Sequence, residues 1–174
     1  MWCNLYFVDY VTEICIQRYV LYFFLCAMFI SSPDFASGAM IPEQYTCRGA
    51  EIPPSLLFGD IPSNAKSLAL SMDDPDAPVG LWTHWLVWNI PVSTTGLTHT
   101  SSSLFPQWRN TGGKIWYRWP CPPSGTHRYY FTLYALDIET LSFDAVPDRK
   151  MFDAGLEGHI IQKAEYMGRV KSIK

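Results

Sequence analysis

The feature that most constrains the fold is a series of short hydrophobic segments, separated by turns rich in Gly and Pro, from residue 32 onward. Residues 67–72 alternate between large hydrophobic side chains and Ser or Ala, which predicts a strand that packs closely on its small-residue side. Residues 84–90 are rich in Trp, Leu, Val and Ile, which predicts a central strand buried on both faces. Residues 127–137 form the longest aromatic strand. The pattern therefore predicts a mainly β domain.

Only one segment, near the C-terminus, has a clear helical pattern. Asp148 can cap this helix, and Gly168 can end it. Its hydrophobic residues recur at every fourth position, at Phe152, Leu156, Ile160 and Ala164. Because strands dominate and the few helices are peripheral, we expect an antiparallel β-sandwich.

Chain length and charge limit the classes of function. The 174 residues suit one domain with a substantial core, and the 48% hydrophobic content favours a packed globule over disorder. The formal net charge is −3, whereas nucleic-acid binding needs an excess of Lys and Arg to displace counterions from phosphates. We therefore expect no nucleic-acid partner.

The composition changes sharply near residue 31, which divides the chain into a hydrophobic leader (1–28) and a domain (29–174). The uncharged run 19–30 is shorter than the roughly 20 apolar residues of a transmembrane helix. The leader carries two acids against one Arg, whereas a signal peptide begins with positive charge. Three interpretations stay open: a signal-like segment, an anchor, or a mis-assigned start with Met28 as the true first residue. We expect a cytoplasmic protein, with export or membrane attachment through the leader as the alternative.

The chain has 5 cysteines, an odd number, and no C-x-x-C spacing, which argues against a structural zinc site. Cys47 and Cys121 lie in the body of the chain, and they could pair in an oxidising compartment. Their separation in sequence cannot test this pairing, so we take them as reduced.

Polar side chains occur in three places where hydrophobic strands begin or end. The acidic turn 73–78 follows the strand 67–72, His84 opens the next strand, and 121–129 leads through two prolines into His127. Imidazoles and backbone N–H groups donate hydrogen bonds to phosphate oxygens, and an aspartate can orient a histidine or receive a ligand ammonium. If these segments meet at one edge of the sandwich, they form a pocket for one oxyanion.

The long segment 109–125 lies between these strands. A loop of this length inside a compact domain is usually functional or disordered. Its aromatic residues Trp116, Tyr117 and Trp119 argue against disorder. We therefore expect an ordered, functional loop.

Two segments, SLALSMDDPDAPVGLWTHWLVWNIP and PCPPSGTHRYYFTLYALD, closely resemble the phosphatidylethanolamine-binding protein family, also called Raf-kinase-inhibitor-like, in its bacterial and archaeal branch. The resemblance runs from about residue 29 to about 170. It implies a β-sandwich with a small pocket at one end that holds phosphate, acetate or a phosphorylated headgroup. Carried over by motif, the ligand-binding residues are Asp74, Asp76, His84, Cys121, Pro122, Pro123, His127 and Tyr129.

This chain departs from the family pattern just before P-C-P-P. Relatives commonly have a glycine pair there, whereas this chain has Arg118 and Trp119. Bulky side chains can narrow the mouth of the pocket, and a guanidinium can add a bidentate contact to an anion. The effect of this pair on the pocket is left to the structure.

The sequence therefore predicts non-catalytic binding of a small anion or phosphorylated headgroup, without a cofactor, with regulation or inhibition of a partner enzyme (a kinase or protease) as one use. The alternative is a hydrolase that uses the same pocket. In it, His84, His127 and Asp74 hold a metal, or Cys121 acts as nucleophile with His127 as base. A membrane-attached headgroup binder is a third hypothesis and depends on the leader. A protein partner stays open, as does a homodimer through exposed aromatic residues such as Trp108 and Trp116.

Overall fold

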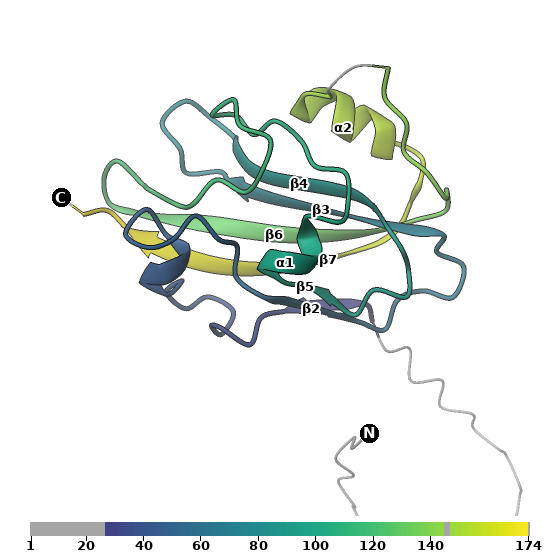
Figure 1. Ribbon diagram of the computed structural model, residues 1–174, viewed down its shortest axis with the longest axis horizontal. Coiled ribbons are helices and arrows are strands. Elements are labelled where there is room, and N and C mark those ends of the chain that lie inside the picture. The colour runs from purple at the N-terminus through teal and green to yellow at the C-terminus, as the bar shows by residue number, and fades with distance from the viewer. Residues whose placement is uncertain (1–26, 145–146, 174) are drawn as a thin grey trace, which may run out of the picture.

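The computed structural model describes residues 27–144 and 147–173, which form two antiparallel sheets and a few short helices (Figure 1). The smaller sheet has the strand order β1–β2–β5, and the larger has the order β4–β3–β6–β7. The strands of the smaller sheet are β1 (Phe29–Ser31), β2 (Leu56–Gly59) and β5 (Gly96–Leu97). The strands of the larger sheet are β3 (Ser67–Asp74), β4 (Trp82–Ile90), β6 (Thr126–Leu136) and β7 (Ile160–Lys171). The predicted mainly β sandwich is confirmed.

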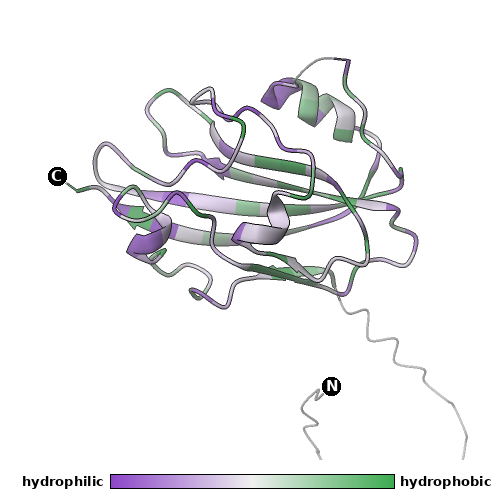
Figure 2. Ribbon diagram, in the orientation of Figure 1, coloured by the Kyte–Doolittle hydropathy of each residue, from purple (hydrophilic) through white to green (hydrophobic). Residues whose placement is uncertain are grey.

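Three short helical segments accompany the sheets: the 3-10 turn η1 (Glu43–Tyr45), α1 (His99–Ser102) and α2 (Arg149–Leu156). In Figure 1 the smaller sheet and α2 lie on opposite sides of the larger sheet. Figure 2 shows hydrophobic residues within the strands, whereas α2 begins with hydrophilic ones. The larger sheet is therefore covered on both faces around β3, which is wholly buried, whereas most residues of β7 are exposed or only partly buried.

The alternation predicted for β3 is confirmed, and it divides the core in two. Leu68, Leu70 and Met72 pack in the cluster between the two sheets. Ala69 packs in a second cluster that includes Phe152 of α2. All eight residues of β3 are buried, because one face meets the smaller sheet and the other meets the helical layer.

The prediction that β4 is a central strand is wrong in its position, although nearly all of the strand is buried. It lies at the edge of the larger sheet, and the segment 106–118 covers that edge. The backbone N–H groups of Thr111 and Arg118 donate to the carbonyl oxygens of Thr83 and His84, at 3.0 and 2.9 Å. Buried backbone groups need partners, and here the long loop supplies those that a neighbouring strand would give.

The predicted C-terminal helix is right in its first half and wrong in its second. Asp148 caps α2 by accepting from the backbone N–H of Met151. The helix ends before Gly158, which has a left-handed φ of 80°, and β7 then pairs with β6 along its length. Gly168 does not end a helix. An added Cβ there would lie 2.4 Å from the side chain of Ile41, so this glycine allows the N-terminal segment to pack against β7.

The N-terminal part of the domain begins with β1, in which Ile30 is buried against the core. The leader 1–28 lies almost wholly outside the described residues. Within the parts of the chain that the structure covers, no helix is long and apolar enough to cross a membrane.

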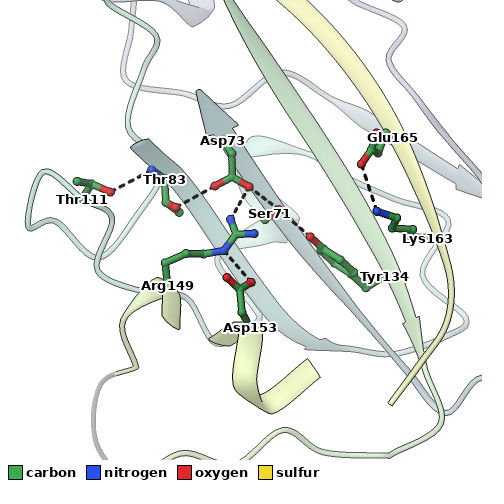
Figure 3. A network of polar contacts seen from close by, with 9 residues as sticks. All are labelled: Ser71, Asp73, Thr83, Thr111, Tyr134, Arg149, Asp153, Lys163 and Glu165. Carbon is green, nitrogen blue, oxygen red and sulfur yellow. Dashed lines mark hydrogen bonds and ion pairs between the residues drawn. The ribbon is translucent and has the colours of Figure 1, made fainter. Parts of the chain in front are cut away.

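A buried polar network attaches α2 to the outer face of β3 (Figure 3). Asp73 accepts hydrogen bonds from Thr83 Oγ1 at 2.8 Å and from Ser71 Oγ at 2.9 Å. Arg149, at the start of α2, forms an ion pair with the same carboxylate and a second ion pair with Asp153 at 2.9 Å. This network neutralises Asp73, one of three acids at the end of β3 and in the turn after it.

We expect Arg149→Ala to lower the free energy of unfolding by about 3 kcal/mol, because it leaves the carboxylate of Asp73 buried without its cation. Urea unfolding measures the loss. Asp153→Ala is the matched control, since it removes only the half-exposed partner of Arg149 and should cost less than about 1 kcal/mol. Equal effects of the two substitutions would contradict this account of the network.

Candidate functional site

A cavity of about 320 Å³ opens where β3 ends and β6 begins. Its lining comes from the acidic turn, the start of β4, the loop 118–123 and the first residues of β6. All the predicted site residues except Asp76 line it: Asp74, His84, Cys121, Pro122, Pro123, His127 and Tyr129. The three segments singled out in the sequence therefore meet at one place, as predicted. That they bind a ligand stays a prediction.

The pair of Asp74 and His127 joins two strands at the base of the cavity. Nδ1 of His127 donates to Oδ2 of Asp74 at 2.8 Å, and both side chains are buried. Oδ1 of the same carboxylate accepts from the backbone N–H of Asp76 at 2.8 Å, which closes the turn after β3. Asp74 thus holds the ring of His127 and shapes the acidic turn at the same time.

His84 is held by the loop rather than by an acid. Its Nδ1 donates to the carbonyl oxygen of Arg118 at 2.8 Å, and its ring lies edge-on to Tyr129 with centroids 5.2 Å apart. Burial, opposed by this hydrogen bond and by nearby Asp74, lowers the pKa of His84 to about 4. The imidazole of His84 is therefore neutral near pH 7.

Tyr129 presents a buried hydroxyl at the wall of the cavity. The side chain is fully buried, and its hydroxyl has no hydrogen-bond partner among the residues that the structure describes. Burial, the negative charge of Asp74 and the approach of its carboxylate to the hydroxyl raise the pKa of this phenol, so it stays protonated and can donate. A buried donor without a partner costs stability, which a ligand oxygen can recover.

The structure places Asp76 outside the cavity lining. Its carboxylate instead accepts hydrogen bonds from Nε of Arg128 at 2.9 Å and from Nη2 at 2.7 Å. It also accepts one from the backbone N–H of Arg128. These hydrogen bonds lower the pKa of Asp76 to about 2. Asp76 therefore holds the acidic turn against the start of β6 rather than facing the cavity.

Arg118 and Trp119, which replace the usual glycine pair, both line the cavity. The guanidinium carbon of Arg118 lies 4.1 Å from the centroid of the Trp119 ring, a cation–π contact. Arg118 has no carboxylate partner among the described residues. The departure from the family pattern therefore adds an aromatic wall and a positive charge to the pocket.

Sequence reasoning missed Trp82 and Val79 and named Ala77 and Pro78 only as members of the acidic turn 73–78, although all four contribute to the lining. Trp82 lies two positions before His84 in β4, so the period of a strand places both on one face. This two-residue spacing from His84 could have identified Trp82 from the sequence. The turn residues have no such periodicity, and only the folded turn brings them to the cavity.

The expectation that Cys47 and Cys121 are reduced is wrong. Cys47 and Cys121 form a disulfide, with Cα atoms 5.4 Å apart, instead of being reduced. The bond closes a long loop of sequence separation 74, a length for which chain-entropy arguments give a stabilisation of about 4 kcal/mol. It also fixes the cavity wall at Cys121 and leaves that residue without the thiol that a nucleophile needs.

The metal alternative has no support in the side-chain arrangement. Across residues 27–144 and 147–173, no group of three or more His, Cys, Asp or Glu is placed to hold a metal ion. Asp74, the carboxylate of that alternative, is engaged by His127. The homodimer surface that the sequence left open loses its named residues, because Trp108 is buried in the core and Trp116 is only partly exposed.

Comparison with known families and sequences confirms the resemblance. Residues 31–171 match the family model described as phosphatidylethanolamine-binding protein. A UPF0098 protein of Chlamydia pneumoniae is 46% identical over 146 residues, which cover 81% of this chain and 97% of the relative. A UPF0098 protein of the archaeon Methanothermobacter thermautotrophicus is 42% identical over 147 residues, with the same coverage of 81% and 97%.

Two solved structures resemble the fold. One is a putative phosphatidylethanolamine-binding protein homologue from Chlamydia trachomatis, with a TM-score of 0.79, 41% identity, and coverage of 84% of this chain and 98% of that one. The other is E. coli YbcL, described as a new member of the mammalian PEBP family, with a TM-score of 0.77, 29% identity, and coverage of 84% and 99%. Bacterial and archaeal relatives therefore share sequence with this chain, and the two bacterial structures share its fold.

Stability should depend on pH through His84. The unfolded chain takes up a proton near the ordinary pKa of 6.5, whereas the folded protein does so only near 4. Stability therefore falls as the pH drops from about 6.5 to about 4, by about 3 kcal/mol, and levels off below. His84→Asn keeps a donor for the Arg118 carbonyl but cannot titrate, so the cost of this substitution should shrink as the pH falls through this range. Urea unfolding without phosphate measures it, and parallel pH curves would refute the assignment.

Proposed function

Because the chain belongs to the phosphatidylethanolamine-binding protein family, we propose that it binds a small anion or a phosphorylated headgroup, without catalysis, in the cavity described above. The observation that carries this proposal is the hydroxyl of Tyr129, a buried donor with no partner among the described residues, at the cavity wall. Such a group costs stability until a ligand oxygen accepts its hydrogen bond.

The size of the cavity supports a small ligand. Its volume of about 320 Å³ is at the lower end of the range of roughly 300–1,000 Å³ for small-molecule sites. The surrounding Trp82, Trp119 and Pro122 give it apolar walls around a few polar groups. This arrangement suits one oxyanion with a short substituent.

The charges also support an anion. Arg118 is the cation of the lining, and its guanidinium is free of carboxylates among the described residues, so it can form charge-assisted hydrogen bonds with a phosphate. A catalytic role has less support, because Cys121 is held in a disulfide and because no described residues form a cluster suited to a metal.

We expect Tyr129→Phe to weaken phosphate binding about fivefold, which corresponds to the roughly 1 kcal/mol of one hydrogen bond. In the absence of phosphate its free energy of unfolding should be unchanged or higher, because the lost hydroxyl had no partner. The matched control is Tyr130→Phe, whose hydroxyl lies near Arg128 on the outside. Titration of phosphate and phosphoethanolamine, followed by NMR of His84 and His127, measures the affinities. Ring signals that do not move with either ligand would refute the proposed pocket.

We expect Arg118→Ala to weaken phosphate binding by tenfold or more, because a hydrogen bond to a charged group contributes about 1.5–3 kcal/mol. Arg109→Ala is the control on the same loop, since Arg109 bonds only to the carbonyl of Gly113 at the surface. The same titration tests both variants. Equal affinities for Arg118→Ala and the unmodified protein would remove Arg118 from the site.

A further inference from the structure

The hydrogen bonds of the two pocket histidines fix which ring nitrogen carries the proton. Nδ1 of His84 faces a carbonyl oxygen and Nδ1 of His127 faces a carboxylate, and both of these oxygens can only accept. Each Nδ1 must therefore be the N–H of its ring. In a neutral imidazole the other nitrogen, Nε2, is then a bare acceptor.

Neither Nε2 has a hydrogen-bond partner within residues 27–144 and 147–173, and both rings line the cavity. With neutral rings, an incoming anion meets two lone pairs and the negative charge of Asp74. Tyr129 and Arg118 offer donors, but the base of the cavity offers acceptors. An anion with no proton of its own cannot form hydrogen bonds with either imidazole in this state.

We infer that the pocket binds its anion together with one proton, which is taken from solvent and resides on Nε2 of His127. The imidazolium then donates from Nδ1 to Asp74 and from Nε2 to the anion, so that opposite charges alternate across the base of the cavity. No covalent bond breaks in this step. The inference rests on the proposed function, because it concerns the same site.

His127 is better placed for this proton than His84. The carboxylate of Asp74 lies 2.8 Å from Nδ1 of His127 and balances an imidazolium, whereas His84 has only a neutral carbonyl at its Nδ1. The desolvation of His84 also lowers its pKa to about 4. A charge on His84 would be buried without an acid in contact with the ring.

The other charged groups around His127 are already accounted for. Asp76 lies near it but is neutralised by Arg128. Arg118 lines the same cavity from the loop 118–123, and a bound anion would carry charge opposite to both cations. On β7 the residue opposite His127 is Val170, which does not titrate, and on β6 Tyr129 stays a neutral phenol. Asp74 is therefore the acid in direct contact with the ring of His127.

Calorimetry with sulfate tests the inference. Sulfate is tetrahedral like phosphate but takes up no proton near neutral pH, so any proton uptake must occur on the protein. At about pH 8, where imidazoles are ordinarily neutral, binding heats in buffers of different ionisation enthalpy should give about one proton taken up per sulfate. The affinity should then fall about tenfold per pH unit in this range.

Two substitutions locate the proton. His127→Gln offers an amide N–H near the position of Nε2 that cannot titrate, so sulfate should bind with no proton uptake and with an affinity that is constant with pH. His159→Gln is the control, because His159 lies at the surface and bonds to Asp137, and it should keep the uptake of one proton. In ¹⁵N spectra of the unmodified protein, sulfate should convert Nε2 of His127 from a bare to a protonated nitrogen.

The outcomes separate the two proposals. If neither sulfate nor phosphate binds between about pH 5 and 9, the proposed function fails. If sulfate binds without proton uptake, or if the bare nitrogen signal of His127 persists at saturation, the proposed function stands and the inference is overturned. Proton uptake that persists in His127→Gln also overturns it. The nitrogen spectrum of the unmodified protein decides the question if that variant does not fold.

Discussion

The hydrogen bond between Asp74 and His127 is the interaction on which the site depends. It joins the last residue of β3 to the second residue of β6, so the register of the larger sheet fixes where the carboxylate and the imidazole meet. Those two strands are buried against both core clusters, which makes the base of the cavity as rigid as the sheet itself. The loops that complete the cavity are then built around this fixed pair.

The three acids of the turn illustrate how the fold manages crowded charge. Each has a different partner in a different direction: Asp73 pairs with Arg149, Asp74 with His127 and Asp76 with Arg128. Because successive residues of a strand point to opposite faces, Asp73 reaches α2 while its neighbour reaches the cavity. The repulsion expected of three adjacent carboxylates is thereby relieved, and only one of them is left to set the charge of the pocket.

The sequence carried most of the fold and part of the site. The alternation in β3 and the meeting of three polar segments followed from strand period and from motif. The error in the C-terminal helix has a simple cause, because residues four apart, such as Ile160 and Ala164, share one face in a strand as well as in a helix. The edge position of β4 could not be foreseen, since it depends on a loop that replaces a neighbouring strand. The disulfide and the unpaired hydroxyl of Tyr129 depend on which residues lie close together in the folded protein. Separation along the chain does not give this information.

The central claim is that two imidazoles, one phenol and one guanidinium surround a space that holds a single oxyanion. A crystal structure of the protein soaked with phosphoethanolamine tests it most directly. We expect phosphate density in the cavity, with one oxygen within hydrogen-bond distance of the Tyr129 hydroxyl and another near Nε2 of His127. A cavity that holds only water at a saturating concentration, or a phosphate bound elsewhere on the surface, would contradict it.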